Sequence, residues 1–136
     1  MVIRNHCGLV MGSSWQCIAG SLSPQCAEAA ASFRGLRFAA DLRIWPSIIE
    51  SDAEAVVNLI NINGDLMPLF EIGIFVKDIR VLLSELNIAR VSFVPRLANS
   101  VAHGLAKLAV SLLSDGFLVD CIPPSVESRV LSDLLR

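Results

Sequence analysis

The sequence has no long apolar run, and this absence excludes a membrane-spanning helix. Hydrophobic residues make up 54% of the 136 residues and the mean hydropathy is +0.62, which is high for a soluble domain. A transmembrane helix needs about 18 or more consecutive apolar residues. The best candidate segment, residues 101–113, is shorter than that and includes His103 and Lys107. We therefore expect no insertion into a membrane.

A secretory leader and a cysteine-based site are also lacking. Arg4, Asn5 and His6 interrupt the N-terminus before an apolar segment develops, so no signal peptide is expected. The few cysteines show neither the close pairing of a zinc site nor the density of a disulfide scaffold. They are Cys7, Cys17, Cys26 and Cys121. These features predict free thiols and a cytoplasmic or nuclear location.

The chain has no excess of positive charge either. Its 11 Lys and Arg face 13 Asp and Glu, which gives a net charge of −2. This balance argues against nucleic-acid binding through a broad basic surface, so any such binding has to be local or assisted by metal ions. A high apolar fraction with few charges also indicates a missing partner or a missing segment.

The hydrophobic patterns predict one domain in which strands and helices alternate. A hairpin of two extended segments is followed by helices and further strands, which argues for a mixed α/β sheet flanked by helices. The expected elements are strands at 1–4, 9–18, 48–49 and 90–94 and helices at 25–41, 52–60, 69–86, 98–113 and 126–135. On the helix at 69–86, Lys77, Asp78, Arg80 and Glu85 are expected to form a solvated face. Residues 1–113 are expected to form the domain, with 114–136 as a tail that carries the short amphipathic helix.

Asp52 stands where a predicted strand ends and a predicted helix begins. In open α/β sheets this edge is where ligands and catalytic groups collect. Asp is also favoured at helix N-termini, because its carboxylate accepts backbone N–H groups, so a simple capping role is the alternative.

Glu28 lies on a helix stripe made otherwise of small residues. The stripe contains Glu28, Ala31, Ser32, Gly35 and Ala39, and small residues let a helix approach a sheet closely. A carboxylate on such a stripe is unexpected unless it faces a cavity.

Four motifs stand in order along the chain: VIRNHCG at 2–8, AEA at 27–29, IESD at 49–52 and FVPRLANSVAHGLA at 93–106. Each motif alone is weak, but four in order at suitable separations are specific. Together they resemble the plant reverse-transcriptase-like branch of the ribonuclease H type 1 family. The resemblance implies a ribonuclease H-like fold, with sheet order 3-2-1-4-5 and helices on both faces.

The resemblance also implies an activity, the cleavage of the RNA strand of an RNA–DNA hybrid by two magnesium ions. Mg²⁺ prefers oxygen ligands, and two such ions can activate a water and stabilise the leaving oxygen. Glu28 and Asp52 match two family carboxylates, and both are therefore expected to be catalytic and to bind Mg²⁺ or Mn²⁺.

Two departures from the family pattern weaken that expectation. The family's first strand, with its catalytic aspartate, precedes the hairpin, and this sequence begins after it. His103 stands where active relatives carry another aspartate; an imidazole suits other metals better than magnesium but can handle a proton or contact a phosphate. His103 is thus a third catalytic candidate. Two of four carboxylates remain, so we expect little or no ribonuclease activity.

Weak binding to nucleic acid, an RNA–DNA hybrid in particular, is the expected partner interaction. Arg34, Arg37, Arg96 and Asn99 are candidate phosphate contacts, with ordinary solvated surface as the alternative. Three functions stay open: a hybrid ribonuclease, a non-catalytic nucleic-acid-binding module, and a decayed retroelement-derived fragment that acts only through protein contacts.

Loss of the first strand would leave open sheet edges. The hairpin strand could close directly on the strand at 48–49 in antiparallel fashion. Alternatively, the gap could stay open and promote self-association, or the sequence could be a truncated gene product. We favour truncation.

Overall fold

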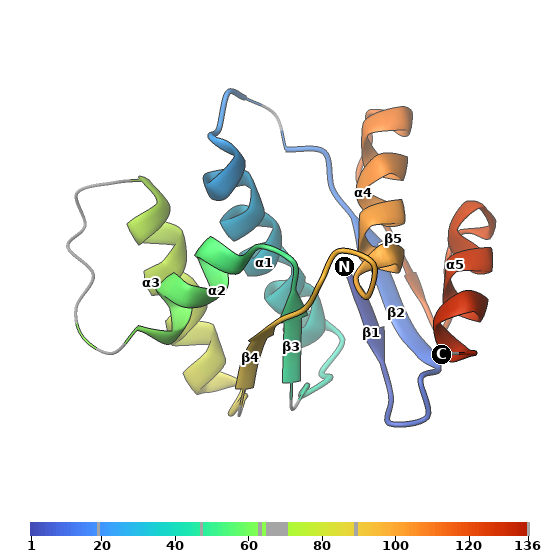
Figure 1. Cartoon of the computed structure of the whole chain (residues 1–136), viewed down its shortest axis with the longest axis horizontal. Coiled ribbons are helices and arrows are strands. Elements are labelled where there is room, and N and C mark those ends of the chain that lie inside the picture. Colours follow the sequence, from blue (N-terminus) through green and yellow to red (C-terminus); the bar gives the residue numbers. More distant parts are fainter. Residues whose placement is uncertain (19, 47, 63, 65–70, 89, 136) are drawn as a thin grey trace. The chain divides into compact units, whose positions relative to one another are not determined.

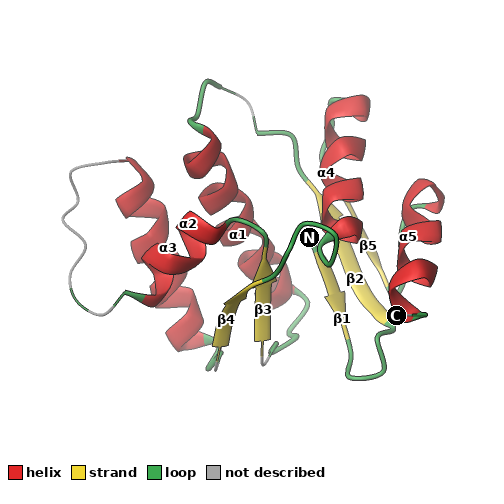
Figure 2. Cartoon of the chain, in the orientation of Figure 1, coloured by secondary structure: helices red, strands yellow, loops and turns green. Residues whose placement is uncertain are grey.

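The computed structural model describes residues 1–136 except 19, 47, 63, 65–70, 89 and 136 (Figure 1). The chain divides into two compact units. The first unit comprises Met1–Ala19 and Pro95–Arg136, and the second comprises Gly20–Val94. Both units combine helices with short strands, so the mixed α/β class is confirmed (Figure 2).

The first unit is built on a three-stranded antiparallel sheet in the order β1-β2-β5. Its elements are β1 (Val2–Arg4), β2 (Val10–Trp15), α4 (Ser100–Leu112), β5 (Gly116–Val119) and α5 (Pro124–Leu134). The predicted hairpin is confirmed. Asn5 Oδ1 closes its turn by accepting from the backbone N–H groups of Cys7 (2.9 Å) and Leu9 (3.0 Å).

The core of the first unit lies where α4 and α5 pack against each other and against the sheet. Buried Val101, Leu105, Val126 and Val130 form its centre. Gly104 allows the close approach of the two helices, since a Cβ there would lie 2.9 Å from Val126 Cγ1. Arg4 on β1 and Asp133 on α5 add an ion pair at 2.9 Å.

The strand β5 was not predicted from the sequence. It follows α4 directly, and its only regular pairing in the described part of the chain is with β2, about 100 residues earlier. The Ser13 hydroxyl, on β2, reinforces this pairing by donating to the carbonyl of Cys121 at 3.0 Å. The predicted tail thus supplies a strand and a helix to the first unit.

The second unit contains a parallel pair of strands covered by helices. Its elements are α1 (Pro24–Asp41), β3 (Ile48–Ser51), α2 (Glu54–Asn61), α3 (Glu71–Glu85) and β4 (Arg90–Phe93). The α1 helix starts as its sequence favours, because Ser23 Oγ accepts from Cys26 N–H and Pro24 occupies the first helical position. The start of the helix predicted at 69–86 falls at residues 69–70, which lie outside the described residues.

Two details of the second unit differ from expectation. Ala31 is exposed, so it does not belong to the buried stripe of α1, which includes Ala29, Gly35 and Ala39. Arg80 is not part of a solvated face. Its guanidinium crosses to the C-terminal end of α2 and donates to the backbone carbonyls of Leu59 (2.8 Å), Ile60 (3.1 Å), Ile62 and Gly64 (2.8 Å).

Each sheet has strands with a single partner. Among the described residues, β1 pairs with β2 only and β3 pairs with β4 only. The β3–β4 pairing is parallel, with Ile48 opposite Arg90 and Ser51 opposite Phe93. Direct antiparallel closure of the hairpin on the 48–49 strand is therefore not among the pairings of the described chain. No helix in the described ranges is both long and apolar enough to cross a bilayer.

Candidate functional site

Asp52 follows the last residue of β3. The backbone N–H of Val94 donates to Ser51 O at 3.0 Å, so the parallel pairing with β4 continues to this end of the strand. Ala53, not Asp52, is the N-cap residue of α2, and the Ser51 hydroxyl accepts from the Ala53 N–H at 3.1 Å. Asp52 itself is half-buried. The aspartate thus stands at the carboxyl edge of the two strands, where α/β sheets bind ligands.

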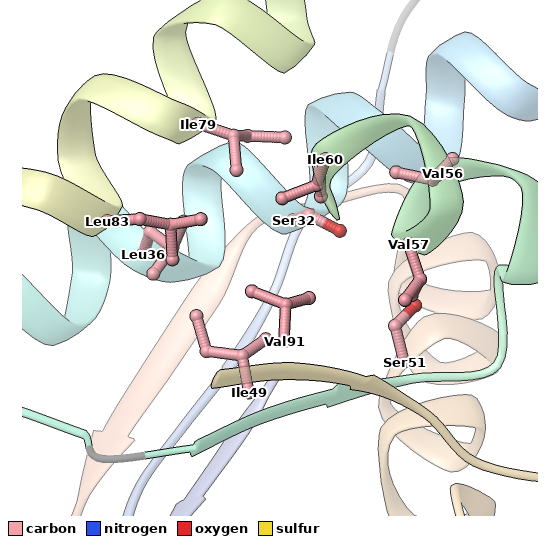
Figure 3. A pocket seen from close by; sticks show the side chains of 10 residues that line it. All are labelled: Ser32, Leu36, Ile49, Ser51, Val56, Val57, Ile60, Ile79, Leu83 and Val91. Carbon is pink, nitrogen blue, oxygen red and sulfur yellow. The ribbon is translucent and has the colours of Figure 1, made fainter. Parts of the chain in front are cut away.

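Glu28 belongs to the second turn of α1, and its side chain is exposed. The views agree that α1 and β3 run in opposite directions (Figures 1 and 3). The first turns of α1 and the end of β3 therefore lie at the same end of the second unit. This arrangement places Glu28 and Asp52 at that end.

A mainly apolar pocket of the second unit lies among α1, α2, α3 and the strands β3 and β4, all of which contribute lining residues (Figure 3). Its polar lining residues are Ser32 from α1 and Ser51 from β3. Ser32 is one turn beyond Glu28 and donates to the Glu28 carbonyl at 3.0 Å, while Ser51 is adjacent to Asp52. The pocket has no ionisable lining residue, so it is core space next to the carboxylates and not the metal site itself.

Three further candidates lie in the first unit, at the start of α4. Asn99 is the N-cap residue, although its side chain makes no capping hydrogen bond to the helix. His103 follows one turn later, and its backbone N–H donates to Asn99 O at 3.1 Å. Arg96 comes before the helix, and its Nη2 lies 3.2 Å from His103 Nδ1.

The contact between Arg96 and His103 was missed at the level of sequence. Both residues were candidates, but separately. The polypeptide turns between them, with Ala98 N–H donating to Pro95 O (2.8 Å) and Asn99 N–H to Arg96 O (3.1 Å). A spacing of seven residues that crosses a turn into a helix gives no periodic signal in the sequence.

Arg34 and Arg37, the other two candidate arginines for phosphate contacts, lie on α1. Both belong to α1, where Arg34 is half-buried and Arg37 is exposed. At 3.6 residues per turn, Arg37 lies about 180° around the helix from Glu28. The structure therefore does not group Arg37 with that carboxylate.

The residues present do not fit a two-magnesium centre. Within the described residues, no group of three or more His, Cys, Asp or Glu side chains is positioned to hold one metal ion. A pair of divalent ions needs several carboxylate oxygens to offset their charge. Glu28 and Asp52 alone are too few for that.

A comparison with protein-family models shows to which family the chain belongs. The family model described as "Reverse transcriptase-like" matches residues 1–109. The chain belongs to the reverse transcriptase-like family. The resemblance seen in the four motifs is thus confirmed at the level of a ribonuclease H-like domain.

The reverse transcriptase-like match covers β1 to most of α4 and ends before β5 and α5. The strand that was missed from the sequence therefore lies outside the matched residues. Comparisons with curated proteins and with solved structures gave no match.

Proposed function

We propose that residues 1–136 form a nucleic-acid-binding member of the reverse transcriptase-like family, close to its plant ribonuclease H type 1 branch, that takes RNA–DNA hybrids as ligand. The observation that carries the proposal is the family match over residues 1–109. The contact of Arg96 with His103 supports it, because it gathers two side chains suited to phosphate at one point. The ribonuclease H-like part is proposed to cover 1–113, with 114–136 as an addition to it.

Hydrolysis by this chain is proposed to be weak or absent. Glu28 and Asp52 are its proposed metal-binding and catalytic carboxylates, for Mg²⁺ or Mn²⁺. Two carboxylates hold one such ion weakly, whereas two-ion phosphodiester hydrolysis depends on positioning and charge stabilisation by a fuller set. His103, at a position where active relatives carry aspartate, adds no negative charge.

Two assays on the 136-residue chain test the proposal. In the first, a labelled RNA–DNA hybrid is incubated with the chain and Mg²⁺ or Mn²⁺, and an Asp52→Asn variant serves as control. Little or no cleavage is expected. Metal-dependent cleavage that disappears in Asp52→Asn would contradict the proposed loss of activity.

In the second assay, gel-shift titrations compare hybrid with duplex DNA at several salt concentrations. Binding that is tighter for the hybrid and weakens with salt is the expected result, since phosphate contacts release counterions. Equal failure to bind either nucleic acid would reject the proposed function.

Protein contact is the second candidate function, and exposed apolar residues in the first unit favour it. Leu135 is 89% exposed, Leu113 79%, Val110 70% and Phe117 64%. Strands with one partner also offer backbone groups for self-association. Oligomers that grow with concentration, seen by analytical ultracentrifugation in a chain without nucleic-acid affinity, would support this candidate instead.

A further inference from the structure

Arg129 of α5 lies across Gly104, the glycine of α4. The two helices pack side by side in the first unit (Figure 1). Arg129 Cδ lies 3.0 Å, and its Nε 3.1 Å, from the place that a Cβ of Gly104 would occupy. Arg129 is half-buried, so its aliphatic stem packs on α4 and its guanidinium stands at the outer end. The missing side chain at residue 104 thus makes room for an arginine that is held by packing.

Lys107 provides a second cation next to this one. It follows Gly104 by three residues, which on an α-helix corresponds to a rise of about 4.5 Å and a rotation of about 60° between the two positions. Lys107 is exposed, whereas Val101 and Leu105 of the same helix belong to the core. The guanidinium over Gly104 and the ammonium of Lys107 therefore belong to adjacent positions on the outer surface of α4.

Neither cation is neutralised within the described part of the chain. The ion pair and the side-chain hydrogen bonds found there involve neither Arg129 nor Lys107. The α4 helix contains no Asp or Glu. On α5, Glu127 is two residues from Arg129 and thus about 160° away around the helix. Two like charges at adjacent positions repel each other, and an anion bound to both removes that repulsion.

Asp133 is the other carboxylate of α5, four residues after Arg129. Its charge is already engaged, because Arg4 Nη2 donates to Oδ2 at 2.9 Å and the Ser100 hydroxyl donates to Oδ1 at 3.4 Å. This nearly neutral pair lies at the first turn of α4, whereas Gly104 and Lys107 belong to its second turn. The surface around Arg129 and Lys107 therefore keeps a net positive charge.

A phosphodiester backbone matches this pair of side chains. Phosphate oxygens accept charge-assisted hydrogen bonds; a guanidinium donates two of them in parallel, and an ammonium acts as a point charge. An arginine whose stem is already packed also loses less conformational freedom on binding than one that moves freely in solvent.

We propose that Arg129 and Lys107 contact the phosphate backbone of nucleic acid along the outer surface of α4. This inference rests on the proposed nucleic-acid binding and adds a contact surface to it. Arg129 lies outside residues 1–109, which match the family model. The C-terminal helix α5 thus brings a ligand contact that the matched residues do not include.

Fluorescence anisotropy of a labelled RNA–DNA hybrid, titrated with the whole chain at several salt concentrations, measures these contacts. Lys107→Gln and Arg129→Met each remove one charge, and methionine keeps an unbranched apolar side chain over Gly104. Each variant is expected to lower the slope of log affinity against log salt by about 1 and to weaken binding about eightfold at about 0.1 M salt. The double variant is expected to lower the slope by about 2. Arg129→Lys keeps the charge and is expected to retain most of the affinity.

Lys77→Gln is the matched control for the loss of one lysine charge. Lys77 is exposed on α3 in the second unit, and this variant is expected to bind like the unaltered chain. Urea denaturation shows whether each variant is folded. Lys107 is exposed, so Lys107→Gln tests the inference even if Arg129→Met loses stability.

The outcomes separate the inference from the proposed function. If the chain binds the hybrid and Lys107→Gln and Arg129→Met bind as tightly as Lys77→Gln, the inference fails and the proposed function stands. If Lys77→Gln lowers the salt slope as much as Lys107→Gln does, net charge alone explains the effect, and again only the inference fails. Absence of binding by the unaltered chain overturns both.

Discussion

The guanidinium of Arg80 binds the end of a neighbouring helix, with Nε donating to the carbonyl of Ile60 at 3.1 Å. The last carbonyls of a helix have no partner within it and carry the negative end of its dipole. One arginine from α3 satisfies several of them at the end of α2. This contact joins α3 to the C-terminal end of α2, although the sequence predicts that Arg80 belongs to a solvated face.

Replacement of Arg80 is therefore expected to destabilise the second unit. Arg80→Met removes donors from carbonyls that include those of Leu59 and Ile60, and a cost of about 1–3 kcal/mol in the free energy of unfolding is expected. Urea denaturation followed by circular dichroism measures it. Lys77→Met, an exposed position on the same helix, is the control and is expected to change little. Equal stability of the two variants would show that the contact contributes nothing.

Gly104 is expected to tolerate no larger side chain without loss of stability. A Cβ at this position would lie 2.9 Å from Val126 Cγ1 and 3.0 Å from Arg129 Cδ. Gly104→Ala is expected to cost about 1–3 kcal/mol through overpacking, although alanine favours helix. In the double variant Gly104→Ala/Val126→Ala, the smaller side chain at 126 relieves part of the clash. The double variant is therefore expected to lose less stability than the sum of the two single variants. If the losses of stability in the two single variants simply add up in the double variant, the close packing of α4 against α5 at Gly104 is contradicted.

The ion pair of Arg4 with Asp133 is expected to contribute modestly. Its N–O distance is 2.9 Å, and the Asp133 side chain is 11% exposed against 25% for Arg4. Asp133→Asn leaves the arginine without its charge partner, and a loss of about 1 kcal/mol is expected, since exposed pairs give less and buried ones more. Thermal unfolding at low and high salt checks the prediction. A loss that does not shrink at high salt would point to packing instead of charge.

A chain that ends at Leu113 tests the role of β5 and α5. Removal of residues 114–136 takes Val126 and Val130 from the core and leaves β2 without its pairing to β5. Hydrogen exchange of the amides of β2 is expected to become faster by at least tenfold, which corresponds to about 1.4 kcal/mol of local stability. The amides of α1 are the internal reference. Unchanged protection of β2 would show that the first unit does not need its last two elements.

Much of the fold could be predicted because local signals were strong. The helices at 25–41 and 69–86 and the strand at 48–49 were predicted from the sequence, and the structure contains α1, α3 and β3 there. The four residues of β5 carry no such signal. Their pairing depends on a strand about 100 residues away, which no local pattern reports.

The candidate site was predictable only in part, and for a related reason. Glu28 and Asp52 were found through motif resemblance and strand-end position, and the structure places them at one end of the second unit. The contacts of Arg96 and Arg80 depend on turn geometry and on long side chains that reach another element. Long flexible side chains have no periodicity of their own, so their partners follow from coordinates alone.

The first unit is assembled from two separate segments, 1–19 and 95–136, whereas the second unit is one continuous segment between them in the sequence. During translation the N-terminal hairpin leaves the ribosome long before α4 and α5 exist. The segment of the second unit is made in between, and Val2 and Val10 have no core to join until α4 and α5 have been made. We therefore expect the first unit to be the later of the two to mature, with an apolar hairpin that stays exposed in the meantime.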